Sequence, residues 1–356
     1  MRPVSLALSV LQNRLGRVPR PSWCTYLVCY RCNARCQMCD SWRLKPGDEL
    51  TPAEVAAVFG KIGRLDVVRL TGGEPFLRED MLEIAEAVRE ESRPFVIHVT
   101  TNGSFPERVV EMVERFSRPQ MLRFMVSFDG LEAEHDRNRG EEVTFAVATE
   151  TVRRLVGLRE RFGVEVSANH TVISPQSLAD NQELRRRMGE WNVDVHSVLA
   201  YADSAMYGAK LRGRKAEHLI VPTGYPLHPL LAGADVLGFV GQELSRVNGF
   251  SSPMLRWGKR YYLRGLRARL RGESPARPNP RCVALRSHIR LLPDGGVPVC
   301  QFNTERVGNL LRQSFEDVWH NGDATASRAW VDKCPGCWAE CEVMPNAIYS
   351  GDIVRG

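Results

Sequence analysis

The chain has 356 residues, is 43% hydrophobic and 25% charged, and carries a formal net charge of +6. Its length allows one large domain and a smaller one, and its composition is that of a globular protein rather than a fibrous or disordered one. No internal repeat and no low-complexity tract is present, which excludes solenoid and linker-like proteins.

Residues 1–20 are predicted to form an amphipathic N-terminal extension. The apolar stretch 4–11 is too short to span a bilayer, and no small-residue cleavage site follows it. We therefore expect no signal peptide and a cytoplasmic location.

Short apolar runs alternate with helical patterns over residues 21–200. One helical stretch begins at Thr51-Pro52-Ala53-Glu54, a capping box with proline at the first helical position. The expected strands are Thr25–Val28, Val67–Thr71, Phe95–Thr100, Leu122–Phe128, Val164–Ile173 and Val193–Leu199. This alternation predicts an α/β fold with a parallel sheet, whose functional residues collect at the carboxyl ends of the strands.

The ten cysteines fall into two groups at opposite ends of the chain. The groups are Cys24, Cys29, Cys32, Cys36 and Cys39, and Cys282, Cys300, Cys334, Cys337 and Cys341. In a cytosolic chain, clustered cysteines indicate metal binding or catalysis rather than disulfides. Two separate cysteine sites are expected.

The first site has the spacing C-x3-C-x2-C at Cys32, Cys36 and Cys39, directly after the first expected strand. Three thiolates on one loop can ligate three irons of a cubane cluster and leave the fourth iron open. The alternative is a closed zinc or four-thiolate site that also uses Cys29. Cys29 and Cys24, however, are expected to be buried in or near a strand as small apolar residues.

This loop resembles the signature of the radical S-adenosylmethionine (SAM) superfamily, and the resemblance extends over the alternating region. It implies a partial (β/α)6 TIM-like barrel and a [4Fe–4S] cluster that binds SAM. Met38 matches the residue that packs on the adenine of SAM. Gly72, Gly73 and Glu74 of Gly-Gly-Glu-Pro match the motif that holds its amino group, which suits glycine backbone and a carboxylate acceptor.

Further matches stand at the expected strand ends. Asn102 follows the third strand, and Ser127 and Asp129 end the fourth, so the resemblance implies that all three lie in the SAM site. It also implies that Ser127 and Arg139 contact the SAM carboxylate and that Asn169 faces the site. A turn or cap role is the alternative for each of these residues. His170 and His196 are expected to be structural.

The second cysteine group, C-x12-G-x4-C followed by C-x2-C-x3-C, resembles the SPASM/twitch auxiliary-cluster domain. A β-hairpin is expected over 291–299. The resemblance implies one auxiliary [4Fe–4S] cluster on Cys282, Cys300, Cys334 and Cys337, with Cys341 either free or replacing one of them. Zinc is the alternative metal. Gln301 stands where related alcohol-oxidising enzymes have an aspartate base, which argues against that reaction here.

The expected domains are the extension 1–20, the barrel 21–200, a basic insert 201–281, the auxiliary domain 282–345 and a tail 346–356. Within the insert, the segment 254–281 interleaves arginines with aromatic residues. We expect it to face a phosphate group or an anionic membrane, the alternative being a solvated helix face.

Together these features predict an enzyme that cleaves SAM reductively and abstracts hydrogen from a small-molecule or lipid-precursor substrate. The alternatives are a peptide-modifying maturase and a non-catalytic structural metal-binding protein. A flavodoxin-type or ferredoxin-type electron donor is expected as a partner, and a nucleic acid is not. Neither the substrate nor the reaction outcome can be predicted from the sequence.

Overall fold

The computed structural model describes residues 3–44, 47–140, 143–203, 220–221 and 224–355. Part of the expected insert 201–281, namely 204–219 and 222–223, lies outside these residues. The domain boundaries given above remain predictions.

A seven-stranded parallel sheet forms the centre of the molecule, in the order β6-β5-β4-β3-β2-β1-β7. The strands are β1 Trp23–Leu27, β2 Val67–Thr71, β3 Val96–Thr101, β4 Leu122–Phe128, β5 Glu165–Val172, β6 Asp194–Leu199 and β7 His288–Leu291. The first six match the six expected strands, which confirms the predicted α/β partial barrel.

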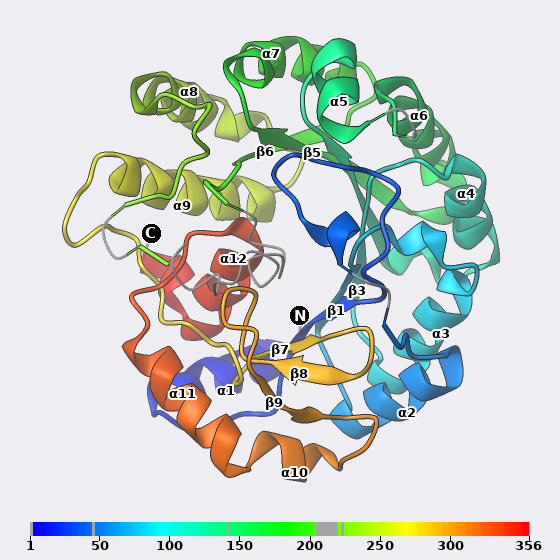
Figure 1. Cartoon of the computed structure of the whole chain (residues 1–356), viewed down its shortest axis with the longest axis vertical. Coiled ribbons are helices and arrows are strands. Elements are labelled where there is room, and N and C mark those ends of the chain that lie inside the picture. The colour runs from blue at the N-terminus through cyan, green and yellow to red at the C-terminus, as the bar shows by residue number, and fades with distance from the viewer. Residues whose placement is uncertain (1–2, 45–46, 141–142, 204–219, 222–223, 356) are drawn as a thin grey trace.

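Helices cover the outer face of this sheet as an arc (Figure 1). They are α2 Pro52–Ile62, α3 Met81–Ser92, α4 Pro106–Arg115, α5 Glu132–Arg139, α6 Phe145–Phe162 and α7 Pro175–Gly189. Helix α2 begins with the expected capping box, in which Thr51 and Glu54 bond to each other's backbone amides. Short 3-10 helices occur at Ser41–Arg43, Pro75–Leu77, Pro119–Met121, Val247–Gly249 and, as η7, at Asp352–Arg355.

The two faces of the sheet differ in burial. On β2 and β3, Val68, Leu70, Ile97 and Val99 are fully buried in the core shared with the helices, whereas the residues that alternate with them keep partial exposure. Because successive side chains of a strand point to opposite faces, the partly exposed residues line the interior of the barrel. The interior is therefore more open than the layer between sheet and helices.

The last strand of the sheet differs from expectation. Residues 291–299 were expected to form a hairpin, but β7 pairs in parallel with β1, and β8 (Gly296–Pro298) pairs with β9 (Arg306–Asn309). Helices α10 Phe315–Trp319, α11 Gly322–Lys333 and α12 Glu340–Ser350 follow. The cysteine-rich region thus contributes a strand to the barrel.

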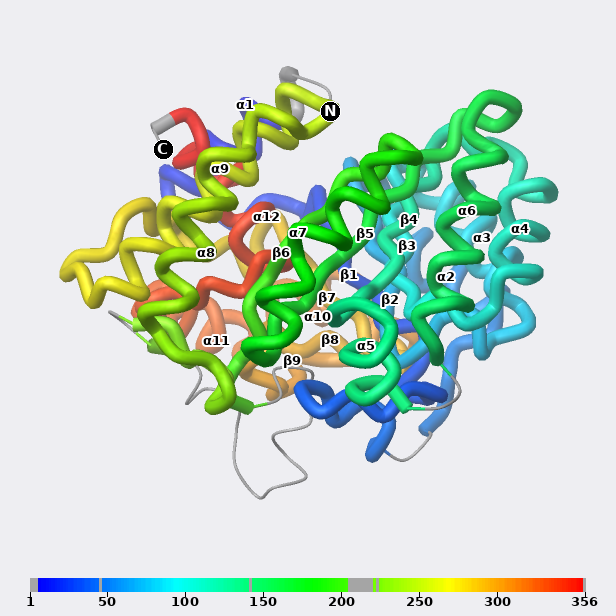
Figure 2. The backbone as a smooth tube through the Cα atoms, turned by 90° about the horizontal axis from the view of Figure 1, so that it is seen from above, coloured from blue at the N-terminus to red at the C-terminus, as the bar shows by residue number. Residues whose placement is uncertain are grey.

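Three more helices lie away from the sheet's outer arc. They are α1 Pro3–Arg14, α8 Gly233–Arg246 and α9 Pro253–Leu270. Figure 2 shows α1 and both chain ends along one edge of the molecule, opposite the segment between β1 and α2. Among the described residues, no helix combines the length and the apolar character needed to cross a membrane.

Candidate functional site

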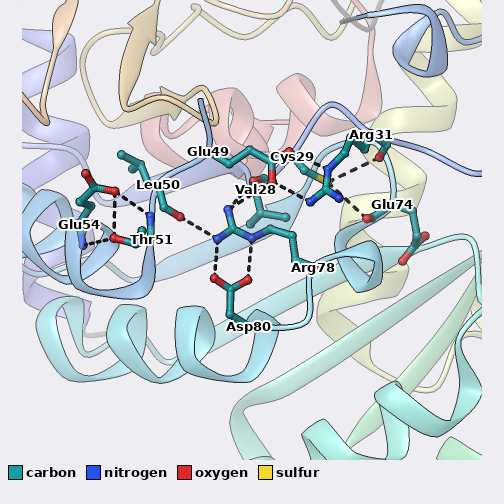
Figure 3. Close-up of polar contacts among 10 residues, drawn as sticks. All are labelled: Val28, Cys29, Arg31, Glu49, Leu50, Thr51, Glu54, Glu74, Arg78 and Asp80. Carbon is teal, nitrogen blue, oxygen red and sulfur yellow. Dashed lines mark hydrogen bonds and ion pairs between the residues drawn. The ribbon is translucent and has the colours of Figure 1, made fainter. Parts of the chain in front are cut away.

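Arg78 fixes both ends of the segment that carries the first cysteine group (Figure 3). Its guanidinium donates to the carbonyl oxygen of Val28, where the segment leaves β1, at 3.2 Å, and to that of Leu50, before α2, at 2.8 Å. Asp80 holds the guanidinium in place through two further hydrogen bonds of 2.8 and 2.6 Å. The ends of the cysteine loop are therefore set by a forked, charge-assisted contact.

Cys32, Cys36 and Cys39 pack together with Met38 in one small cluster. The amide of Cys39 donates to the carbonyl oxygen of Cys36 at 3.2 Å, which closes a turn between the second and third cysteines. Burial raises the pKa of the Cys32 thiol to about 12 and raises that of Cys36 as well. The loop thus gathers three cysteines in a confined site, as its spacing predicts.

Cys29 lies apart from that cluster. It is fully buried, and its thiol donates to the carbonyl oxygen of Glu74 at 3.3 Å. Burial raises its pKa to about 12. Cys24 is also fully buried within β1. The expected structural burial of both cysteines is confirmed.

Gly72 and Gly73 permit a close approach between the end of β2 and the cysteine loop. A side-chain carbon on Gly72 would lie 2.3 Å from the carbonyl oxygen of Cys29, and one on Gly73 would lie 1.9 Å from that of Arg31. The amides of Gly73 and Glu74 donate to these same two oxygens at 2.9 and 2.8 Å. The Gly-Gly pair is thus required by backbone contact with the cysteine loop.

Glu74 ties the end of β2 to the end of β3. Its buried carboxylate accepts hydrogen bonds from the Thr101 hydroxyl and the Asn102 amide, both at 2.7 Å, and from the Phe76 amide at 3.0 Å. Burial raises its pKa to about 7. Three donors already use this carboxylate, so its first role is to position the neighbouring loops.

Asn102 connects β3 to the cysteine loop. Its side chain donates to Asn33 Oδ1 at 2.9 Å, and Asn33 in turn donates to the Ser104 hydroxyl at 3.0 Å. Asn33 lies between the first two cysteines and was not singled out from the sequence. Its position between Cys32 and Cys36 was the one sequence feature that could have indicated a role in the site.

Asp129 and Arg139 form a buried pair beside the same loop. The carboxylate of Asp129 accepts two hydrogen bonds from the guanidinium, at 2.6 and 2.7 Å, and a third from Asn138 at 2.6 Å. Burial raises the pKa of Asp129, but the Arg139 charge outweighs it and holds the pKa below its usual value. The carbonyl oxygen of Arg139 accepts from the Arg35 amide at 2.9 Å.

Asn138 makes two direct contacts with the cysteine loop that sequence reasoning missed. It accepts a hydrogen bond from the Gln37 amide at 3.1 Å and donates to Met38 Sδ at 3.4 Å. It therefore fixes the methionine that the family resemblance places against adenine. An asparagine near a helix end resembles a cap residue in sequence, which hides such a role.

Ser127, Asn169 and His196 share one register row on β4, β5 and β6. Asn169 donates to the Thr171 hydroxyl at 3.4 Å. His196 packs against Phe250 with ring centroids 5.2 Å apart, and burial lowers its pKa to about 3. Ser127 and Asn169 thus lie side by side on the inner face of the barrel, at the end where the cysteine loop lies.

His170 lies on the opposite face of β5. Its Nδ1 is 2.9 Å from Asn181 Nδ2 on α7, and burial lowers its pKa to about 4. A buried, neutral imidazole with a side-chain partner agrees with the structural role expected for this residue.

Four cysteines of the second group line one cavity. Cys282, Cys300, Cys334 and Cys337 all border it, together with Glu342. Cys341 is absent from its lining and instead donates its thiol proton to Gln301 Oε1 at 3.0 Å. The structure thus separates the four expected ligands from the fifth cysteine.

Glu342, which sequence reasoning missed, carries a buried charge beside this cavity. Its carboxylate pairs with Arg290 and lies 3.4 Å from His288 Nδ1, both on β7. Arg290 holds the pKa of Glu342 down to about 2 against the opposing effect of burial. Arg290 also donates to Gln301 Oε1 at 3.4 Å. Gln301, which stands where related alcohol-oxidising enzymes have an aspartate, is therefore held in place by a cation.

The chemistry of both cysteine groups fits iron–sulfur clusters. Over the described ranges, no three Cys, His, Asp or Glu side chains converge on a single ion position. The second group instead surrounds a cavity, with four thiols at its border. Thiolates are the usual ligands of such clusters, each binding a different iron.

Two family models match the chain. The model described as the radical SAM superfamily matches residues 26–188, and an iron–sulfur cluster-binding domain model, SPASM, matches residues 282–341. The first range runs from within β1 to within α7 and contains the cysteine loop, and the second contains all five C-terminal cysteines. Both domains imply [4Fe–4S] clusters.

Curated relatives match parts of the chain. A GTP 3',8-cyclase of Aquifex aeolicus is 32% identical over 155 residues, which is 40% of this chain and 45% of that protein. A pre-heme d1 synthase of Dinoroseobacter shibae is 32% identical over 195 residues, 53% of this chain and 45% of that protein. The chain thus spans less than half the length of either relative.

Solved structures share the fold over nearly the whole chain. Native anSMEcpe with bound AdoMet has a TM-score of 0.60 at 14% identity, covering 94% of this chain and 98% of that one. Streptococcus suis SuiB bound to S-adenosylmethionine has a TM-score of 0.61 at 14% identity, covering 90% and 70%. With both family models matched in chain order and this fold shared, the chain belongs to the radical SAM superfamily and carries a C-terminal SPASM-type iron–sulfur cluster-binding domain.

Proposed function

We propose that this chain is an enzyme that cleaves SAM reductively and removes a hydrogen atom from its substrate. One observation carries the proposal: the cysteine loop is hydrogen-bonded to the segments that follow β2, β3 and β4. The contacts are Arg31 with Glu74, Asn33 with Asn102, and Arg35 with Arg139. They bring the three loop cysteines together with most of the residues that match SAM-binding positions.

In this proposal Cys32, Cys36 and Cys39 ligate a [4Fe–4S] cluster, and Met38, held by Asn138, lies against the adenine. Gly72, Gly73 and Glu74 receive the amino group of SAM. When bound, the reduced cluster supplies the electron that splits SAM into methionine and a 5′-deoxyadenosyl radical.

The remaining residues of the site orient SAM. Asp129 uses two of the five guanidinium donors of Arg139 in the hydrogen bonds above, which leaves donors for the SAM carboxylate. Ser127 and Asn169 face the same site from β4 and β5, and Asn102 braces its loop. Asp129 acts by holding Arg139 rather than by touching SAM.

We further propose that Cys282, Cys300, Cys334 and Cys337 hold the auxiliary [4Fe–4S] cluster and that Cys341 is not a ligand. The cavity lining and the Cys341–Gln301 contact support this choice.

A small-molecule or lipid-precursor substrate is the favoured class. The relatives named above are a cyclase of GTP and a synthase of a heme precursor, both of which suggest small molecules. A peptide-modifying maturase is the second candidate, because the shared fold includes SuiB bound to the precursor peptide SuiA, with a TM-score of 0.60.

Partners and location belong to the same proposal. The chemistry requires a one-electron donor, for which a protein of flavodoxin or ferredoxin type is proposed. Contact of residues 254–281 with an anionic membrane is proposed from the arginines of α9, and a cytoplasmic location is retained as a prediction.

Anaerobic reconstitution tests the proposal. We expect about eight irons, four for each cluster, and formation of 5′-deoxyadenosine when SAM and dithionite are added. C36A should abolish 5′-deoxyadenosine formation, C337A should lose about four irons, and C341A should keep all of them.

Tightly bound zinc without iron or 5′-deoxyadenosine would overturn the proposal in favour of a structural metal protein. Loss of iron in C341A equal to that in C337A would contradict the choice of auxiliary ligands.

A further inference from the structure

A row of polar side chains crosses the interior of the barrel below the SAM site. Strand register aligns Arg290 on β7 with Thr25 on β1, Thr25 with Arg69 on β2, and Arg69 with His98 on β3. The row continues to Arg123 on β4 and Glu165 on β5. Neighbouring strands are roughly 5 Å apart, so these side chains are neighbours.

Two of the three arginines in this row have a carboxylate partner. Arg290 pairs with Glu342, and Arg123 Nε lies 2.8 Å from Glu165. Arg69 has neither an ion pair nor a hydrogen bond among the described residues, and its Nε is buried without a partner. Its guanidinium carbon lies 6.0 Å from the centroid of the Trp23 ring.

Two ring nitrogens on strands beside Arg69 also lack partners. His98 Nδ1 on the adjacent strand and Trp23 Nε1 on β1 are also buried without a hydrogen-bond partner. Burial and the Arg69 charge lower the pKa of His98 well below its usual value, so its ring is neutral and carries one proton to donate. Arg69 keeps partial exposure as a residue, but its Nε and His98 Nδ1 are buried polar atoms without partners, and Glu340 and Glu342 act on its charge only through space. Buried unsatisfied polar atoms are rare in folded proteins, and a bound anion would satisfy these.

The position suits a substrate. Arg69 precedes Thr71 by two residues, and Thr71 leads directly into Gly72, so Arg69 lies roughly 7 Å below the end of β2 along the strand. At the other end of the row, Arg290 contacts Gln301 of the cysteine-rich domain. The row therefore lies between the two cysteine groups, on the more open face of the sheet.

We infer that Arg69 and His98 form an anion-binding position inside the barrel, which receives a carboxylate or phosphate group of the substrate. The inference rests on the proposed function, since it assigns part of that enzyme's substrate. It narrows the substrate to molecules that carry such an anionic group. A guanidinium fork and a neutral imidazole donor together suit a planar carboxylate or a phosphate.

Thermal unfolding of the reconstituted protein with and without inorganic phosphate tests the inference. Phosphate at ten times its dissociation constant should raise the Tm of the wild type by about 2 °C more than it raises that of R69Q. Without phosphate, R69Q should melt at or above the wild-type temperature, because the substitution removes a partly buried charge that no carboxylate contacts. R69K, which keeps the charge, should retain part of the phosphate response.

The matched control is R123Q, which removes an arginine of the same row whose charge Glu165 already balances. Its phosphate response should equal that of the wild type. An equal response in R69Q and the wild type would overturn the inference, and so would loss of the response in R123Q. A lower Tm of R69Q without phosphate would mark Arg69 as structural, for instance as a counter-charge for the auxiliary cluster. Failure of SAM cleavage would leave this binding result untouched.

Discussion

At the scale of single residues, the site depends on buried charges that are neutralised by one partner. Asp129 is fully buried, and Arg139 beside it is 5% exposed. Because both side chains are buried, water cannot solvate the charge of one residue if the other is removed. Arg139 is therefore held in one orientation, which its proposed contact with SAM requires.

Replacement of Asp129 by asparagine should destabilise the protein by about 3 kcal/mol, because it leaves the Arg139 charge buried without a counter-ion. Chemical denaturation of D129N and the wild type measures the difference. E150Q is the control, since Glu150 pairs with Arg153 and Arg154 at the surface, and it should change stability little. Equal losses of unfolding free energy in D129N and E150Q would show that the burial of the Asp129–Arg139 pair does not matter.

Buried neutral histidines make stability depend on pH. The pKa of His170 is lowered to about 4 by burial, with a smaller effect of Arg185, whereas Asp129 opposes the shift. In the unfolded chain its pKa is about 6.5. Between these values the unfolded state binds a proton that the native state does not, so stability falls as the pH falls from about 6.5 towards 4.

H170Q should lose less stability than the wild type between pH 7 and pH 5, by about 2 kcal/mol. A glutamine amide oxygen can still accept from Asn181, so the fold should be kept. Denaturation curves at the two pH values give the comparison, and H320Q, a change at an exposed surface histidine, serves as control. If the free energy of unfolding of H170Q changed with pH as it does in the wild type, His170 would be protonated in the folded state.

At the scale of elements, helix α9 packs closely against the cysteine-rich domain at Gly265. A side-chain carbon on Gly265 would lie 2.0 Å from the Trp338 ring, and Trp338 donates to the carbonyl oxygen of Tyr262 at 2.9 Å. Arg269 covers the ring at 3.7 Å from its centroid. Trp338 directly follows Cys337, so this packing supports the auxiliary site.

G265A should lower the free energy of unfolding by about 1–3 kcal/mol, because the added methyl group overlaps the indole. G241A is the matched control, a glycine of α8 that has no atom within 4 Å of an added carbon. It should stabilise the protein by about 0.5–1 kcal/mol. Thermal unfolding of both variants and the wild type measures these changes. Unchanged stability in G265A would mean that α9 and Trp338 separate easily.

The sequence predicted most elements and the ligand loops, but not every connection. The six barrel strands and the capped helix α2 follow from apolar runs and from Thr51 and Glu54. The pairing of β7 with β1 could not be predicted, because four residues, His288–Leu291, carry no signal of their distant partner. Asn33, Asn138 and Glu342 were missed because single polar residues in sequence resemble turn or cap residues.

At the scale of the whole molecule, exposed apolar side chains gather on few elements. Of the eight large ones among the residues that the structure describes, six belong to α1 and the residue after it, α9 and η7. They are Leu8, Leu11, Leu15, Met254, Trp257 and Val354. All three elements contact α12.

Helix α1 turns its polar side towards the protein. Asn13 donates to the Ser287 hydroxyl at 2.7 Å and to the carbonyl oxygen of Tyr349 at 3.0 Å, which leaves the leucines outside. No acidic residue precedes Asp40 or occurs between Glu243 and Glu273. Apolar side chains next to arginines that outnumber nearby carboxylates suit the surface of an anionic membrane.

Vesicles containing phosphatidylglycerol should therefore bind the protein, and neutral phosphatidylcholine vesicles should bind it weakly. Reversal of two charges on α9 and one at its C-cap, in R264E/R267E/R271E, should weaken binding by about 100-fold. Serine at Leu8, Leu11 and Leu15 should also weaken it. Co-sedimentation measures both, with R115E/R153E/R186E, three equal charge changes on other helices, as control. Binding that survives in the α9 variant would refute membrane contact through this helix.

The parallel pairing of β7 with β1 also bears on how the chain is made. Strand β1 leaves the ribosome long before its neighbour on one side, residues 288–291, is synthesised. During that interval one edge of β1 presents unpaired amides and carbonyls, which can capture other strands. The nascent barrel thus stays open on that side of β1 until the cysteine-rich region emerges, and β7, the last strand of the seven-stranded sheet to be made, covers this edge.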